Sequence, residues 1–193
     1  MLFRLGSPPN SLSDAELASG QWKKLPWPPV WALHLLSLPI SVAAGLLVFV
    51  AWARFTPRIN VSFAPGYQVA AMFFIIIVLG MFLQLSTHPR MGFTKNSVVG
   101  VWPSRLMPYT AQPFKMTKAR LVTSLLLPFV VLALLPLVIA SIARTSSGWL
   151  VFGSCLSAGL FGLNIVLSTL ALRIPNGSLV AGRGFQPYWR LAR

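Results

Sequence analysis

Residues 30–53 read VWALHLLSLPISVAAGLLVFVAWA, an apolar stretch without Lys, Arg, Asp or Glu. A helix needs about 20 such residues to cross the hydrocarbon core of a bilayer. Lipid offers no hydrogen-bond partner to the backbone, so helix is the expected conformation. The length of the stretch, and the mostly polar residues 1–29 before it, favour an uncleaved membrane anchor over a signal peptide.

Three further stretches share this apolar character: residues 67–87, 121–142 and 149–172. The prolines inside the predicted spans are expected to kink them; they are Pro39, Pro128 and Pro136. The sequence therefore predicts an all-α membrane protein with a four-span domain over 30–172. A cytoplasmic segment, 1–29, precedes this domain, and a cytoplasmic tail, 173–193, follows it.

The composition agrees with a membrane protein. The chain has 193 residues, of which 55% are hydrophobic and 9% charged, whereas a soluble domain carries about 25% charged residues. Disorder is excluded because disordered chains are poor in apolar residues. Asp14 and Glu16 are the only carboxylate side chains. The single cysteine, Cys155, allows neither an internal disulfide nor a cysteine-based zinc cluster.

The basic residues predict the orientation. Thirteen of the 16 fall on one side of the four spans and three on the other, namely Arg54, Arg58 and Arg144. By the positive-inside rule, both termini and the loop 88–120 lie in the cytoplasm. The charge is spread along membrane edges and no nucleic-acid-binding motif occurs, which argues against nucleic acid as a partner. Anionic lipid headgroups are the expected partners of this charge.

Several short elements are expected outside the spans. Ser13 and Glu16 fit a capping box that begins a helix over about 14–19, and Gly20 is suited to end it. Indoles and ammonium groups at the entry of a span are typical interfacial anchors; they are Trp22, Trp27, Trp31, Trp189, Lys23 and Lys24.

The loop 88–120 is too long for a simple connector. Residues 97–102 have strand composition, 103–105 read as a turn, and 106–116 are suited to return. A short β-hairpin or a re-entrant excursion is expected, with Thr117 as the cap of the third span. The tail 173–193 is expected to be short and irregular.

Few polar groups lie near the predicted spans, and each is a candidate. His34 and His88 are expected in the same leaflet, where a paired metal or haem site is geometrically feasible. Two imidazoles alone make a poor metal site, so no cofactor is predicted and interfacial hydrogen bonding is favoured. A second group suits either a helix-packing face or a cavity; it comprises Gln84, Asn164, Ser168 and Gly162.

Common catalytic arrangements are absent from the sequence. No carboxylate follows Glu16, which excludes a Ser-His-Asp triad and the paired carboxylates of glycoside hydrolases elsewhere in the chain. There is no P-loop and no G-x-G-x-x-G after a strand.

Two stretches of the sequence carry loose motifs in a distinctive order. They are residues 87–137, THPRMGFTKNSVVGVWPSRLMPYTAQPFKMTKARLVTSLLLPFVVLALLPL, and residues 173–190, RIPNGSLVAGRGFQPYWR. A Val-Gly-Val-Trp-Pro segment, a Tyr, a basic entry to a proline-containing span and a Pro-Tyr-Trp tail follow one another. In this order the chain resembles a family of small bacterial zincin-like membrane proteins, distantly similar to site-2-type intramembrane metalloproteases. The resemblance implies the family's fold and a bacterial inner-membrane location.

The chain departs from this family at the metal site. The family's His-Glu-x-x-His motif is expected near the end of the second span, but residues 76–87 read IIVLGMFLQLST. An acidic third ligand is expected in the fourth span, but residues 158–172 read AGLFGLNIVLSTLAL. A zincin needs two imidazoles at i and i+4 and a Glu as general base. The resemblance therefore implies the fold and argues against the activity and against bound metal.

The leading hypothesis is a non-catalytic pseudoenzyme that serves as an accessory or scaffold subunit of a membrane complex, with other membrane proteins as partners. The second is a carrier or binder of a lipid or small hydrophobic molecule, which an open apolar tunnel between spans two, three and four would favour. The third is a residual membrane enzyme that uses His34 and His88.

Overall fold

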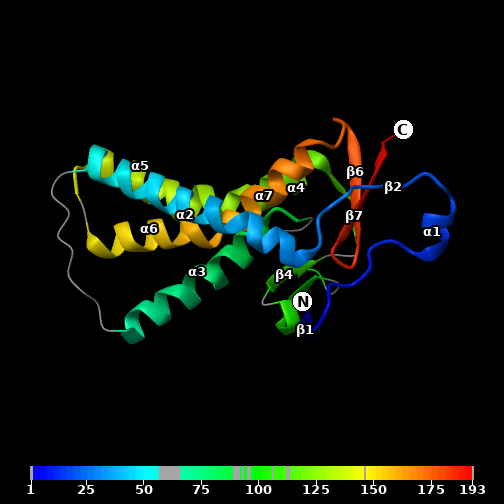
Figure 1. The fold of residues 1–193 in the computed structure, drawn as a ribbon, viewed down its shortest axis with the longest axis horizontal. Helices are drawn as coiled ribbons and strands as arrows, with labels where there is room; N and C mark the ends of the chain where they lie inside the picture. The colour runs from blue at the N-terminus through cyan, green and yellow to red at the C-terminus, as the bar shows by residue number, and fades with distance from the viewer. Residues whose placement is uncertain are drawn as a thin grey trace.

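The computed structural model describes residues 2–56, 66–88, 92, 94, 97–105, 107–111, 114–145 and 147–192. The protein is mainly helical, with two small β-sheets. Figure 1 shows the long helices at one end and the two sheets at the other, with both termini at the sheet end. The basic residues Arg58, Arg90, Lys95 and Arg193, and parts of the loop 88–120, lie outside the described residues.

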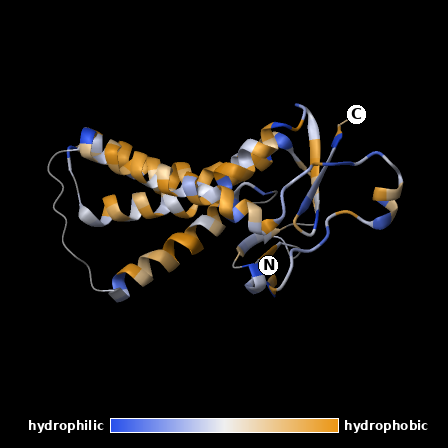
Figure 2. Ribbon diagram, in the orientation of Figure 1, coloured by the Kyte–Doolittle hydropathy of each residue, from blue (hydrophilic) through white to orange (hydrophobic). Residues whose placement is uncertain are grey.

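The helices follow the apolar stretches of the sequence. They are α2 Val30–Phe55, α3 Gly66–Ser86, α4 Lys118–Phe129, α5 Leu135–Ala143, α6 Gly148–Leu160 and α7 Gly162–Leu172. Three helical segments are long and apolar enough to cross a membrane, namely α2, α3 and the continuous helix Lys118–Ala143. Several such helices are typical of a multi-pass membrane protein. Figure 2 shows that apolar residues dominate these helices.

The fourth predicted span, 149–172, is not one straight helix. It is divided at Phe161 into α6 and α7, whose axes are bent by 45°. Counting the bent pair as one span brings the total to four. The side chain of Phe161 is buried, and a Cβ placed on Gly80 of α3 would lie 2.2 Å from its ring. The bend therefore lies where α3 packs closely against it.

Prolines distort the third span as expected. Between α4 and α5, residues Val130–Leu134 form a π-helical turn, with Pro128 before it and Pro136 after it. Proline lacks a backbone N–H and cannot bond to the carbonyl four residues earlier, so the helix widens there. By contrast, α2 continues through Pro39 without a break.

The first sheet has the order β1-β3-β4. Its strands are β1 Leu2–Leu5, β3 Val98–Trp102 and β4 Met107–Ala111. A 3₁₀ turn over Pro103–Arg105 joins β3 to β4 as an antiparallel hairpin, which is one of the two forms expected for this loop. The parallel pairing of β1 with β3 was not expected, because it joins the start of the chain to a distant loop.

The second sheet corrects two expectations. Its order is β2-β7-β6-β5, and its strands are β2 Lys23–Lys24, β5 Met116–Thr117, β6 Ser178–Arg183 and β7 Gln186–Leu191. The tail is therefore a β-hairpin and not irregular, and the protein is not all-α. Gly177 and Gly184 have positive φ angles of 77° and 57°, which allow the tight reversals before and between these strands.

The N-terminal segment 8–22, here called the strap, crosses the second sheet. Ser11 exchanges backbone and side-chain hydrogen bonds with Gly182 of β6. Within the strap, α1 Asp14–Ala18 begins with the predicted capping box at Ser13 and Glu16. Two ion pairs hold α1, one between Glu16 and Lys115 and one between Asp14 and Arg183.

Close helix packing positions α7. A Cβ placed on Gly162 would lie 2.1 Å from Ser41 Oγ and 2.8 Å from Ser41 Cα of α2. The largest buried side chain of the helical region, Trp52 of α2, packs in a cluster with residues of α5, α6 and the π turn. This packing fixes the first turn of α7 opposite the end of α3, where the pocket described next is formed.

Candidate functional site

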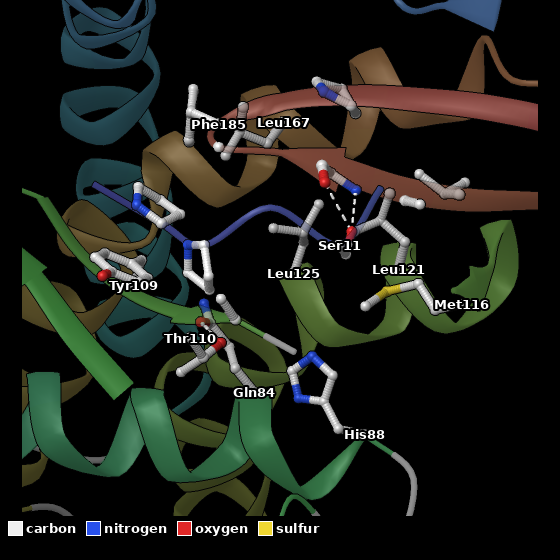
Figure 3. A pocket seen from close by; sticks show the side chains of 18 of the residues that line it. Ser11, Gln84, His88, Tyr109, Thr110, Met116, Leu121, Leu125, Leu167 and Phe185 are labelled. Carbon is white, nitrogen blue, oxygen red and sulfur yellow. Dashed lines mark hydrogen bonds between the residues drawn. The ribbon is translucent and has the colours of Figure 1, made fainter. Parts of the chain in front are cut away.

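A pocket of about 220 Å³ lies where the helices meet both sheets. Its walls come from the end of α3, from α4, from the first two turns of α7, from β4, from the β6–β7 hairpin and from the strap. Figure 3 shows Gln84 and His88 on the α3 side, Leu121 and Leu125 on α4, and Phe185 beyond them. Spans two, three and four thus all contribute to one cavity.

Most of the lining is apolar. Leu121 and Leu125 come from α4, and Leu163 and Leu167 come from α7. Trp27 packs edge to face against Phe185, with 5.4 Å between the ring centroids. An apolar wall with a few polar groups is typical of small-molecule pockets.

Gln84 is one of the polar residues of the pocket and already has partners. Thr110 Oγ1 of β4 donates a hydrogen bond to Gln84 Oε1 over 3.2 Å, and Ser124 Oγ of α4 donates to the Gln84 carbonyl over 3.4 Å. Gln84 therefore ties α3 to β4 and α4. Asn164, from the same group of polar candidates, lines the same pocket.

Three other polar atoms of the lining are buried without a hydrogen-bond partner. They are Trp27 Nε1, His88 Nδ1 and Asn164 Nδ2; elsewhere in the described part of the chain, only Trp52 Nε1 and Ser178 Oγ are in the same situation. Leaving such a group unpaired costs about 1–3 kcal/mol, and buried polar groups are nearly always bonded. Three of the five such atoms in the described part of the chain thus belong to residues that line this pocket.

His88 is in the pocket as a neutral imidazole. The residue is 5% exposed, and burial lowers its pKa below the ordinary value of 6.5; a hydrogen bond with the Leu85 backbone acts in the opposite direction, and the positive charge of Arg120 acts in the same direction as burial. The neutral ring is therefore favoured at neutral pH. It therefore offers one ring N–H donor and one acceptor nitrogen, not an imidazolium.

The structure separates the two histidines that the sequence paired. His34 is half-buried on α2, with its Nε2 3.1 Å from the carbonyl oxygen of Arg105, and it does not line the pocket. Ser168 donates to the carbonyl of Ile165 within its own helix. Gly162 lies against Ser41 of α2. Of the polar residues that the sequence suggested, Gln84, His88 and Asn164 meet in the pocket.

The six expected interfacial anchors occupy different environments. Trp22 is buried with Leu12 and Ala181, and its ring faces Lys115 and Arg190. Trp27 lies in the pocket, so neither of these indoles is an exposed anchor. Trp31 is exposed on α2. Lys23 and Lys24 form β2 beside β7, where the Lys23 ammonium lies 5.4 Å from the centroid of the Trp189 ring.

Within the described residues, no three His, Cys, Asp or Glu side chains lie together as metal ligands would. The pocket contains one residue of these types, His88, among its lining residues. Sequence reasoning missed Trp27 as a pocket residue, and it missed Pro8, Pro9 and Ser11 of the strap. No local pattern could have revealed them, because their position depends on pairing with the distant β6.

No protein-family model, curated protein or solved structure matches this chain. The resemblance to zincin-like membrane proteins therefore rests on the order of motifs in the sequence and stays a prediction.

Proposed function

We propose that this protein is a multi-pass protein of the bacterial inner membrane that binds a small amphipathic molecule in the pocket. The observation that carries the proposal is the set of three unpaired polar atoms, on Trp27, His88 and Asn164, around one mainly apolar cavity. Such a cavity suits a molecule with acceptor atoms at one end and hydrocarbon at the other. This is the carrier or binder hypothesis, which an open apolar tunnel between spans two, three and four was expected to favour; the pocket is instead lined by residues of those spans together with both sheets.

The position of the pocket supports this choice. It lies at the level where the helix ends give way to the sheets, and Arg120 at the start of α4 acts electrostatically on its residue His88. In the proposed topology this level is the cytoplasmic interface, because basic residues concentrate on the cytoplasmic side. An amphiphile in the inner leaflet would place its polar end at this depth.

A second candidate function is the accessory or scaffold subunit. The observation in its favour is α3, on which only Ile76, Gly80 and Leu85 are buried. Most of its apolar surface is uncovered within the chain. In this proposal another membrane protein covers that face, whereas lipid covers it in the first proposal. A catalytic role through His34 and His88 has less support, because His34 does not line the pocket.

The test is a comparison of small molecules that co-purify with the protein in a mild detergent, identified by extraction and mass spectrometry. Leu125→Trp fills the cavity, and Asn164→Leu removes one unpaired amide, so both variants should lose a molecule that the wild type retains. Leu35→Trp is the matched control, because Leu35 is 59% exposed on α2 and should retain it.

Melting temperatures of all four proteins show whether the variants fold. A molecule retained equally by wild type, Leu125→Trp and Asn164→Leu would contradict binding in this pocket. A protein partner that co-purifies with all variants while no small molecule is found would favour the subunit function.

A further inference from the structure

We infer that the pocket selects an anionic headgroup on a single hydrocarbon chain, a carboxylate such as that of a fatty acid. This inference rests on the proposed function and names the class of its ligand. It is carried by three features of the pocket: the donors that line it, the helix that begins in it and the signs of the charges around it.

The unpaired side-chain atoms include two pure donors. The indole Nε1–H of Trp27 and the amide Nδ2–H of Asn164 can only donate hydrogen bonds. The acceptor oxygen of Gln84, by contrast, already receives a hydrogen bond from Thr110. The free hydrogen-bonding capacity of these side chains therefore suits an acceptor, and a carboxylate accepts through both of its oxygens.

The break at Phe161 places a helix N-terminus at the pocket. Leu163 and Asn164, in the first turn of α7, both line the cavity. The first N–H groups of a helix have no partner within it, and this end carries a partial positive charge. Helix N-termini bind anions for this reason, and broken membrane helices of transporters direct them at substrate carboxylates. A continuous fourth span would have no such end here.

The charges around the pocket have the same sign. Neither carboxylate of the chain lines it, and both are engaged elsewhere, Glu16 with Lys115 and Asp14 with Arg183. Arg120 is close enough to His88 to act on it electrostatically. Phe114 and Met116, on either side of Lys115, contribute to the lining. A cationic headgroup would meet repulsion and would find no carboxylate.

The size of the cavity limits the ligand. A volume of about 220 Å³ lies just below the usual range of ligand pockets, about 300–1,000 Å³. This space suits a carboxylate and the first carbons of a single chain. The leucines of α4 and α7 would contact the start of the chain.

The experiment titrates three probes of equal chain length into protein held in amphipol: decanoate, decanol and decyltrimethylammonium. Calorimetry should show decanoate binding at least tenfold more tightly than decanol, and no specific binding of the cation. Asn164→Asp keeps the size of the side chain but adds a negative charge, so it should weaken decanoate at least tenfold and leave decanol nearly unchanged. Trp27→Phe should also weaken decanoate.

Trp52→Phe is the matched control, because Trp52 Nε1 is likewise buried and unpaired but lies in the helical core. It should bind decanoate as the wild type does. If decanol binds as tightly as decanoate, the anionic headgroup is refuted while the pocket proposal stands. If no probe binds, the proposed function fails with it. If decanoate binding survives both Asn164→Asp and Trp27→Phe, the assignment to this pocket is overturned.

Discussion

Glu16 is one of two residues with a carboxylate side chain in this protein, and it has more than one structural role. It completes the capping box of α1 and receives a hydrogen bond from the Lys115 ammonium. These contacts, the one from Lys115 first, lower the pKa of Glu16 from 4.5 to about 2. Pro8, Pro9 and Ser11 of the strap line the pocket. Because Glu16 anchors the strap, it also stabilises this part of the pocket wall.

The stability of the strap should therefore depend on acidity. Because the folded pKa lies below the unfolded one, the stabilisation by Glu16 is present above about pH 4.5 and is lost as the pH falls towards 2. Hydrogen exchange of the Ser11 amide, which bonds to Gly182, should accelerate over that range after correction for the intrinsic rate. Glu16→Gln keeps the capping box and should remove this pH dependence while raising exchange at neutral pH.

Asp14→Asn serves as the control for the strap. The side chain of Asp14 is 86% exposed in its ion pair with Arg183, and exposed ion pairs contribute little. This variant should keep the pH response of the wild type. An identical response in Glu16→Gln would show that the Lys115 contact does not hold the strap.

At the scale of elements, the contact of α2 with the bent pair α6–α7 determines where the pocket forms. Ser41 of α2 faces both Gly159 at the end of α6 and Gly162 at the start of α7. The absence of a side chain at Gly162 lets the two helices approach closely. As a result, Asn164 stands at the cavity and not at the lipid.

Gly162→Ala should destabilise the protein by about 1–3 kcal/mol, the usual range for overpacking. The added Cβ would lie 2.8 Å from Ser41 Cα and 2.9 Å from Ser41 N, and backbone atoms cannot rotate away as a side chain can. Thermal unfolding in detergent, followed by circular dichroism, measures the loss.

Gly159→Ala is the matched substitution one turn earlier. Its Cβ would meet nothing closer than the Ser41 carbonyl oxygen at 3.7 Å, an ordinary contact, and Ala is the better helix former. Its melting temperature should stay equal to that of the wild type or rise. Equal losses in both variants would contradict the close approach at Gly162.

At the scale of the whole molecule, the helices extend between an end formed by the two sheets and an opposite end without sheets. Figure 1 shows the C-terminal ends of α2 and α5 at the end away from the sheets, while both termini lie with the sheets. Of the basic residues that the structure describes, Arg54 and Arg144 lie at the end away from the sheets. This arrangement agrees with the sequence, in which thirteen of the 16 basic residues fall on one side of the predicted spans and three on the other.

A pair of reporters can test the resulting topology. A reporter active only in the cytoplasm, fused after the last residue, should give a signal, and so should one active only outside, inserted between Thr145 and Ser147. The physical reason is the concentration of basic residues at the sheet end, which is retained in the cytoplasm. Activity of the external reporter at the C-terminus, with no cytoplasmic signal there, would refute the model of four crossings with both ends in the cytoplasm.

Local sequence patterns are enough to predict the apolar helices, the capping box of α1 and the candidate polar residues Gln84, His88 and Asn164, and they offer the hairpin β3–β4 as one of two alternatives. These features follow from local causes: apolar runs long enough for a bilayer, side chains that cap a helix, strand residues on both sides of a turn, and polar groups in apolar surroundings. Each can be evaluated within one continuous stretch of the sequence, of about 20 residues for a span and fewer for a cap or a hairpin.

The tertiary structure alone decided the second sheet, the strap, the bend at Phe161 and the separation of His34 from His88. Strand pairing between Lys24 and Tyr188 has no local signature, because its hydrogen bonds form between segments far apart in the chain. The bend lies where Phe161 meets Gly80 of another helix. The pocket is the sum of these long-range contacts, which is why the sequence could suggest its polar residues but not that they surround a cavity.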